Sequence, residues 1–154
     1  MSVYFLDSSA LAKRYLPKTG SDWICDLLNP SSGNEATVSR ITHVELTSAV
    51  IRRTRGGSLT QDQADAILSQ FKEDVVSEFV TLEITPAVLD EAIGLVVKHR
   101  LRAYDSAQFA TACELKRQMS GLDLADFRFI SADSELNTAA VAEGLDVENP
   151  LHHQ

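Results

Sequence analysis

Four acidic residues stand out in the sequence because each one interrupts or directly follows an apolar stretch: Asp7, Glu45, Asp105 and Asp133. A carboxylate inside or beside a buried segment needs a partner, because an unpaired buried charge is costly. Few basic residues lie close in sequence to Asp7 or Asp133. A divalent cation is an economical partner for several carboxylates that converge on one point, and oxygen ligands suit Mg²⁺ or Mn²⁺. The four acids are therefore candidates for a single metal site.

Each acid also has a structural alternative when it is considered alone. Asp7 and Asp133 each directly precede a predicted helix, so either could cap the N-terminus of that helix. Glu45 could form a capping box with Thr42. Asp105 could lie near the N-terminus of its own helix only because the positive end of the helix dipole stabilises a carboxylate. Taken singly, the four residues leave these alternatives open.

The elements that position these acids follow from apolar periodicity and from turn residues. A continuous apolar run from Val3 to Leu6 predicts a strand that is buried on both faces and ends at Asp7. Further strands are expected at residues 36–38, 79–84, 127–130 and 145–147. Helices are expected at residues 10–16, 21–28, 40–55, 60–78, 86–99, 103–119 and 133–143, with a loop at 121–126.

This alternation of strands and helices predicts right-handed βαβ units and an α/β fold. We expect three layers, in which helices cover both faces of a mostly parallel central sheet of about four to five short strands. A chain of 154 residues fits one domain at residues 1–150, followed by a tail at 151–154 with no fold content. Active sites of such folds lie at the carboxyl ends of the strands, which is where Asp7 and Asp133 are placed.

The predicted helix at residues 86–99 has a broad apolar face. Its inward-facing residues are expected to be Val88, Leu89, Ala92, Ile93, Val96 and Val97, which recur at helical spacing. The apolar segments 67–75 and 89–97 could also offer an interface, but a role in the core is favoured. We therefore assign this face to the interior.

The net charge of −8 argues against a protein that binds nucleic acid nonspecifically through a basic surface. Any such role would depend on local basic patches such as Lys13-Arg14 or Arg52-Arg53, for which solvated helix ends are the alternative. No segment has the length and apolar character of a membrane span, and no secretory signal precedes Val3. The expected location is cytoplasmic, without a membrane partner.

The order and spacing of the four acids resemble those of the PIN-domain family along almost the whole chain, from Val3 to Pro150. Residues 3–15, Val-Tyr-Phe-Leu-Asp-Ser-Ser-Ala-Leu-Ala-Lys-Arg-Tyr, resemble the opening strand, first acid and first helix of the family. The string Val-Glu-Leu around Glu45 resembles the second acid. Residues 102–112, Arg-Ala-Tyr-Asp-Ser-Ala-Gln-Phe-Ala-Thr-Ala, resemble the third, and residues 131–136, Ser-Ala-Asp-Ser-Glu-Leu, the fourth.

This resemblance implies a site that binds one or two Mg²⁺ or Mn²⁺ ions, with the hydroxyls of Ser9 and Ser131 beside it. The implied ligands and catalytic residues are Asp7, Glu45, Asp105 and Asp133. The implied activity is that of a metal-dependent endoribonuclease that hydrolyses RNA phosphodiester bonds, as in the VapC-like toxins of type II toxin–antitoxin systems. The resemblance also implies RNA as substrate, a cognate VapB-like antitoxin as partner, and a homodimer.

Two other functions were weighed against this one. A phosphohydrolase of the haloacid-dehalogenase type also begins with an apolar strand that ends in Asp, but it needs a second acid two residues later, where this chain has Ser9. A noncatalytic PIN-fold binding module would hold a single structural ion. Four retained acids weigh against that module, because uncompensated carboxylates in one place cost stability.

Overall fold

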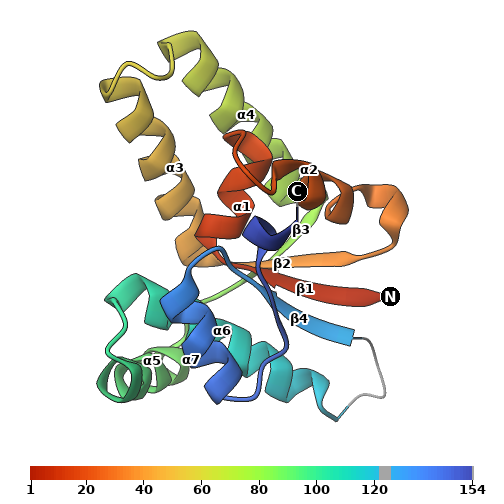
Figure 1. Ribbon diagram of the computed structural model, residues 1–154, viewed down its shortest axis with the longest axis vertical. Helices are drawn as coiled ribbons and strands as arrows, with labels where there is room; N and C mark the ends of the chain where they lie inside the picture. The colour runs from red at the N-terminus through yellow and green to blue at the C-terminus, as the bar shows by residue number, and fades with distance from the viewer. Residues whose placement is uncertain (122–125, 154) are drawn as a thin grey trace.

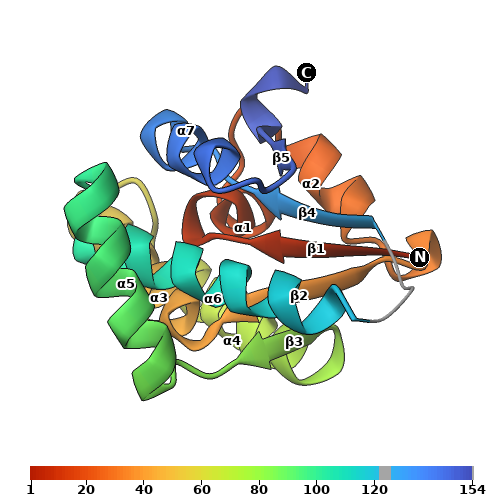
Figure 2. The ribbon, with the colours of Figure 1, turned by 90° about the horizontal axis from the view of Figure 1, so that it is seen from below.

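The computed structural model describes residues 1–121 and 126–153. At its centre lies one sheet of five strands in the order β3-β2-β1-β4-β5 (Figures 1 and 2). The strands are β1 (Ser2–Leu6), β2 (Glu35–Ser39), β3 (Phe79–Leu82), β4 (Asp126–Ile130) and β5 (Val147–Glu148). All four neighbouring pairs are parallel, which confirms the predicted α/β fold with a parallel central sheet.

Helices connect the strands throughout the described residues. They are α1 (Ser8–Tyr15), α2 (Ser21–Leu27), α3 (Arg40–Arg55), α4 (Gln61–Ser77), α5 (Pro86–His99), α6 (Ala103–Met119) and α7 (Ser134–Ala142), with short 3₁₀-helices η1 (Pro30–Ser32) and η2 (Pro150–His152). The side chains of Ser39, Thr60 and Thr85 cap α3, α4 and α5 by accepting backbone N–H groups of the first turn.

The helices form two layers, with α1 to α4 over one face of the sheet and α5 to α7 over the other (Figures 1 and 2). Side chains of a strand alternate between the two faces. Leu6 accordingly packs in the core beneath α1 to α4, whereas Phe5 packs in the core beneath α5 to α7. The ring of Phe5 stacks on that of Phe129 with centroids 5.8 Å apart. The expected three-layer arrangement is confirmed.

The register of the two central strands determines which residues meet at the carboxyl edge of the sheet. Leu6 at the end of β1 pairs with Ile130 at the end of β4. The backbone N–H of Asp7 then donates to the carbonyl of Ile130 at 3.1 Å. Asp7 and Ser131 therefore emerge side by side where the two strands end.

A buried polar network holds α1 against α4. The hydroxyl of Tyr15 donates to Asp74 at 2.5 Å, and burial raises the pKa of Tyr15 far above its usual value. Arg14 pairs with Asp74 at 3.3 Å and with Glu78 at 2.8 Å. Because α1 directly follows Asp7, this network anchors the end of α1 that is remote from the first acid.

The C-terminal residues depart from the expected featureless tail. Pro150–His152 forms η2, and the ring of His153 stacks on Trp23 with centroids 4.0 Å apart and an interplanar angle of 3°. Gly20 has a φ of +86°, and a side chain there would lie 2.3 Å from the Pro150 carbonyl oxygen. The sequence did not indicate this ordered C-terminal segment, because ring stacking and close backbone contact join residues that are far apart in the sequence. Gln154 lies outside the described residues.

The inward orientation predicted for the whole apolar face of α5 is wrong in part. Val88 and Ala92 are buried, but Leu89, Ile93 and Val97 are 48%, 64% and 78% exposed. Those three follow one another at intervals of four residues, so they form one outward stripe beside the buried one. Helix α5 lies at the periphery of its layer (Figure 2). Only part of its apolar face therefore meets the core.

Two smaller predictions also differ from the structure. The last strand lies at Val147–Glu148, two residues later than expected, and β3 ends at Leu82. The predicted loop at 121–126 falls mostly on residues 122–125, which lie outside the described residues. Within the described ranges, no helix combines the length and apolarity that crossing a membrane requires.

Candidate active site

Asp7 lies directly after β1 and is 3% exposed. It caps α1, because its Oδ1 accepts the backbone N–H of Ala10 at 2.9 Å. The hydroxyl of Ser9 donates to the same oxygen at 2.7 Å, and that of Ser131 donates to Oδ2 at 2.7 Å. Burial raises the pKa of Asp7 to about 6, although these three hydrogen bonds oppose the rise. Asp7 is thus both a helix cap and a buried carboxylate.

Ser9 in the first turn of α1 and Ser131 directly after β4 connect the segments that follow β1 and β4. Their hydroxyl oxygens lie 3.4 Å apart. Ser9 accepts the backbone N–H of Ala132 at 2.9 Å, and Ser131 accepts that of Asp133 at 3.1 Å. Both serines were predicted to lie near the site, and both contact Asp7. They fix the orientation of its carboxylate.

Glu45 projects from α3 and is half-buried. Its Oε1 accepts from the side-chain nitrogen of Gln108 at 3.0 Å. The same nitrogen lies 2.8 Å from the hydroxyl of Ser8 and 2.7 Å from that of Thr42. Gln108 therefore ties α6 to α1 and α3. The structural alternative for Glu45, a capping box with Thr42, is excluded, because Ser39 caps α3 and the hydroxyl of Thr42 accepts from Gln108.

Asp105 lies in the first turn of α6, and Asp133 caps α7 by accepting the backbone N–H of Leu136 at 3.0 Å. Burial raises the pKa of Asp105, and so do the charges of Asp133 and Glu45. Arg102 lowers this pKa from 4.0 Å away, but its side chain is 85% exposed. The charge of Asp105 contributes in turn to the raised pKa of Asp7. Asp105 therefore lies close enough to each of the other three predicted acids to interact with it electrostatically.

The donor set suits a hard divalent cation, because it consists of carboxylate and hydroxyl oxygens. Across residues 1–121 and 126–153, no three His, Cys, Asp or Glu side chains form a ready-made metal-binding group. Over the same ranges, the exposed Arg102 is the one basic side chain that pairs with any of the four acids. The cluster thus has an unbalanced negative charge, which an added cation would neutralise.

Several residues of this site were not predicted. Gln108 lies three positions after Asp105 in α6, a spacing that places both on one helix face and could have indicated its role. The contacts of Ser8 and Thr42 with Gln108 had no signal in the sequence. The ring of His43, two residues before Glu45, lies edge-on to Phe71 with centroids 5.6 Å apart.

A family model described as "PIN domain" matches residues 4–141 of the chain. The chain belongs to the PIN-domain family. The matched range contains the whole acidic cluster, from Asp7 to Asp133. Members of this family are generally nucleases. A comparison with curated protein sequences finds no match.

Solved structures similar to this PIN domain include components of toxin–antitoxin complexes. FitAcB from Neisseria gonorrhoeae matches with a TM-score of 0.67 and 18% identity, over 97% of this chain and 99% of that chain. VapBC2 from Rickettsia felis, bound to a DNA fragment from its promoter, matches with a TM-score of 0.64 and 14% identity, over 96% of this chain and 98% of that chain. A toxin–antitoxin complex from Klebsiella pneumoniae matches with a TM-score of 0.59 and 16% identity, over 97% of this chain and 98% of that chain. At these identities the similarity establishes the fold.

The raised pKa of Asp7 predicts how the stability of this PIN domain depends on pH. In metal-free buffer the folded protein binds the Asp7 proton more tightly than the unfolded chain, so this contribution is complete below about pH 4. The contribution is lost as the pH rises through about 6. The difference between the ordinary pKa of 3.8 and the raised pKa of about 6 corresponds to roughly 3 kcal/mol in the free energy of unfolding. Asp105 acts in the same direction, because its pKa is also raised.

Urea unfolding of wild type and Asp7→Asn between pH 4 and 7.5 would measure this effect. Asp7→Asn should gain stability relative to wild type as the pH rises from about 4 to about 6, because its residue 7 does not titrate. The difference should then level off. A difference that stays constant over this range would contradict the raised pKa.

Proposed function

We propose that this protein is a divalent-metal-dependent endoribonuclease that hydrolyses RNA phosphodiester bonds. The observation that carries the proposal is the clustering of Asp7, Glu45, Asp105 and Asp133 at the carboxyl edge of the sheet of a PIN domain. The acids come from four separate elements: the end of β1, α3, α6 and the start of α7. Structural capping explains two of them, but it gives no reason for Glu45 and Asp105 to lie beside the others.

The same four carboxylates would hold Mg²⁺ or Mn²⁺. When bound, such an ion would polarise the phosphodiester and lower the pKa of a water molecule. Ser9 and Ser131 would keep the Asp7 carboxylate oriented through the hydrogen bonds they already donate. Gln108 would do the same for Glu45. These supports matter because small errors in the position of a catalytic group are costly.

Purified protein should cleave RNA in the presence of Mg²⁺ or Mn²⁺ and should stop when EDTA is added. Hydrolysis of the phosphomonoester p-nitrophenyl phosphate should be negligible. This pair of substrates separates a nuclease from a haloacid-dehalogenase-like phosphohydrolase, and a noncatalytic module would act on neither. RNA cleavage that persists in excess EDTA, or turnover of the phosphomonoester alone, would refute the proposal.

We further propose that the protein is the toxin of a toxin–antitoxin pair, with a VapB-like antitoxin as partner and a homodimer as its assembly. The support is the similarity of its fold to chains of the complexes named above. Expression of the wild type alone should slow bacterial growth, and co-expression of a small protein encoded next to it should relieve the effect. Asp7→Asn serves as the inactive control. Normal growth despite soluble, RNA-cleaving protein would remove the toxin assignment.

A further inference from the structure

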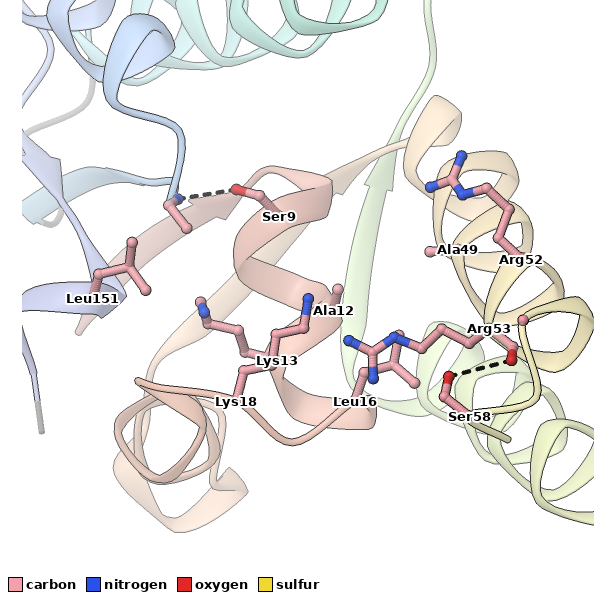
Figure 3. Close-up of a pocket in the computed structure, with 12 residues that line it drawn as sticks. Ser9, Ala12, Lys13, Leu16, Lys18, Ala49, Arg52, Arg53, Ser58 and Leu151 are labelled. Carbon is pink, nitrogen blue, oxygen red and sulfur yellow. Dashed lines mark hydrogen bonds between the residues drawn. The ribbon is translucent and has the colours of Figure 1, made fainter. Parts of the chain in front are cut away.

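A cavity of about 630 Å³ lies between α1 and α3, next to the acidic cluster. Figure 3 shows the side chains that line it. A second cavity of about 330 Å³ is lined by Glu45 and Ser8. The two cavities share four lining residues: Ser9, Ala12, Ala49 and Arg52. They therefore form one continuous groove, which has an acid at one end.

The other end of this groove is positively charged. Lys13, Lys18, Arg52 and Arg53 line the larger cavity, and no Asp or Glu appears among its described lining residues. Over residues 1–121 and 126–153, none of these four cations forms a salt bridge, whereas Arg14, Arg117 and Arg128 all do. We call these four residues the basic pocket. Unpaired cations gathered in one cavity are unexpected in a chain of net charge −8.

Lys13 makes this pocket more than a set of solvated surface charges. Its side chain is 5% exposed, and its ammonium group donates to the carbonyl of Thr19 at 2.7 Å. Burial and the neighbouring charge of Lys18 lower the pKa of Lys13. An ammonium group that is partly buried and has no carboxylate partner loses part of its hydration, and a bound anion would compensate that loss. Lys18 and Arg53 line the same cavity and add to its positive charge (Figure 3).

Phosphate is the anion that fits this arrangement best. Arginine binds phosphate through paired N–H donors, and lysine binds it as a compact charge. An RNA strand carries a phosphate at every nucleotide, so one strand can present one phosphate to the acids and another to the basic pocket. The small side chains of Ala12 and Ala49 leave the passage between the two ends open.

We propose that the basic pocket of Lys13, Lys18, Arg52 and Arg53 binds an internucleotide phosphate of RNA that flanks the scissile phosphate. The proposal rests on the ribonuclease function proposed above and adds a second anchoring point for the strand. The pocket fixes the register of the RNA, and the acids determine where it is cut.

Neutral-linkage substitution tests this assignment. A short RNA substrate is prepared as a series in which one phosphate at a time is replaced by an uncharged methylphosphonate. For wild type, one flanking replacement should lower kcat/KM about 10- to 100-fold, as expected for the loss of a charged hydrogen bond. Arg53→Gln should show a similar loss on unmodified RNA, and it should be insensitive to that same replacement. Lys18→Gln should behave in the same way with a smaller effect.

Arg55→Gln is the matched control, because it removes the same charge from the same helix at a residue that does not line the pocket. It should respond to the methylphosphonate series as wild type does. Lys13 is left unchanged because its burial risks misfolding. If Arg53→Gln and Lys18→Gln keep wild-type kcat/KM and the wild-type response to every replacement, the pocket binds no phosphate and the proposal is wrong.

Binding measured in EDTA by fluorescence anisotropy separates this proposal from the proposed activity. If wild type cleaves no RNA, the ribonuclease function fails. The pocket assignment still stands in that case if one methylphosphonate linkage weakens binding of RNA to wild type and Arg53→Gln binds the modified and unmodified RNA equally. It is wrong if no methylphosphonate linkage changes the affinity of wild type. An acidic segment of a protein partner is the alternative occupant of the pocket, and an oligoglutamate peptide tests it. If Arg53→Gln weakens binding of the peptide but not of RNA, the pocket binds an acidic protein partner and the proposal is overturned.

Discussion

Replacing Asp7 with Asn should lower kcat/KM for RNA by about 100-fold or more while the protein stays folded. Partners that only orient metal ligands typically cost 10- to 100-fold when they are lost, so a direct ligand should cost at least as much. Asparagine keeps the shape of aspartate, and its Oδ1 can still accept the N–H of Ala10. The substitution therefore removes the charge and preserves the cap. Steady-state cleavage of a fluorogenic RNA would measure the loss.

Asp105→Asn should lower kcat/KM by a similar factor, because Asp105 is also a proposed metal ligand. Asp105 caps no helix, so this loss cannot come from a lost cap. Asp62→Asn is a suitable control, since Asp62 is an exposed acid in the first turn of α4. That helix begins at the end of the α3–α4 hairpin that lies away from the sheet (Figure 1). Circular dichroism would verify that all variants are folded. Full activity in a folded Asp7→Asn protein would mean that Asp7 acts only as a helix cap.

Mn²⁺ should raise the melting temperature of the wild type by roughly 5–10 °C at a concentration 100 times its Kd. Mass action at that ratio contributes about 2.7 kcal/mol, and 1 kcal/mol shifts the melting temperature by about 2–4 °C in a chain of this size. The ion binds the assembled acids better than the unfolded chain, where they lie far apart. Relief of mutual repulsion should meanwhile preserve or raise the melting temperature of metal-free Asp7→Asn.

Thermal melts of wild type, Asp7→Asn, Asp105→Asn and Asp62→Asn, each with EDTA and with Mn²⁺, would measure these shifts. The two site variants should respond to Mn²⁺ much less than wild type, and Asp62→Asn should respond equally. Identical shifts in all four proteins would place the ion elsewhere and would overturn the metal assignment.

Local sequence was sufficient to predict the elements and the place of the first and last acids. The uncharged apolar run before Asp7 is typical of a strand that is covered on both faces. The cap positions of Asp7 and Asp133 follow from the helices that come directly after them. The parallel sheet then places both at one edge, because every strand ends on the same side. Each of these inferences needs only residues that are close in sequence.

The parts that failed depend on contacts between distant residues. Gln108 reaches Ser8 across 100 positions and Thr42 across 66, and no local pattern encodes such pairs. The apolar face of α5 has a helical period, but periodicity cannot say how much of that face a neighbour covers. Leu89 and Val88 are adjacent in sequence and equally apolar, yet only Val88 meets the core. The basic pocket likewise combines Lys13 of α1 and Lys18 of the segment after it with two arginines of α3, and α2, η1 and β2 lie between them in the sequence.

Trp23, which stacks on His153, is the only tryptophan in the chain. The segment that carries His153 also supplies Leu151 to the wall of the cavity beside the basic pocket. Indole emission depends on the surroundings of the ring, so the intrinsic fluorescence of this protein is a label-free spectroscopic signal for how its C-terminal residues are seated. Excitation of one chromophore therefore reports on one wall of the groove rather than on an average over the whole molecule.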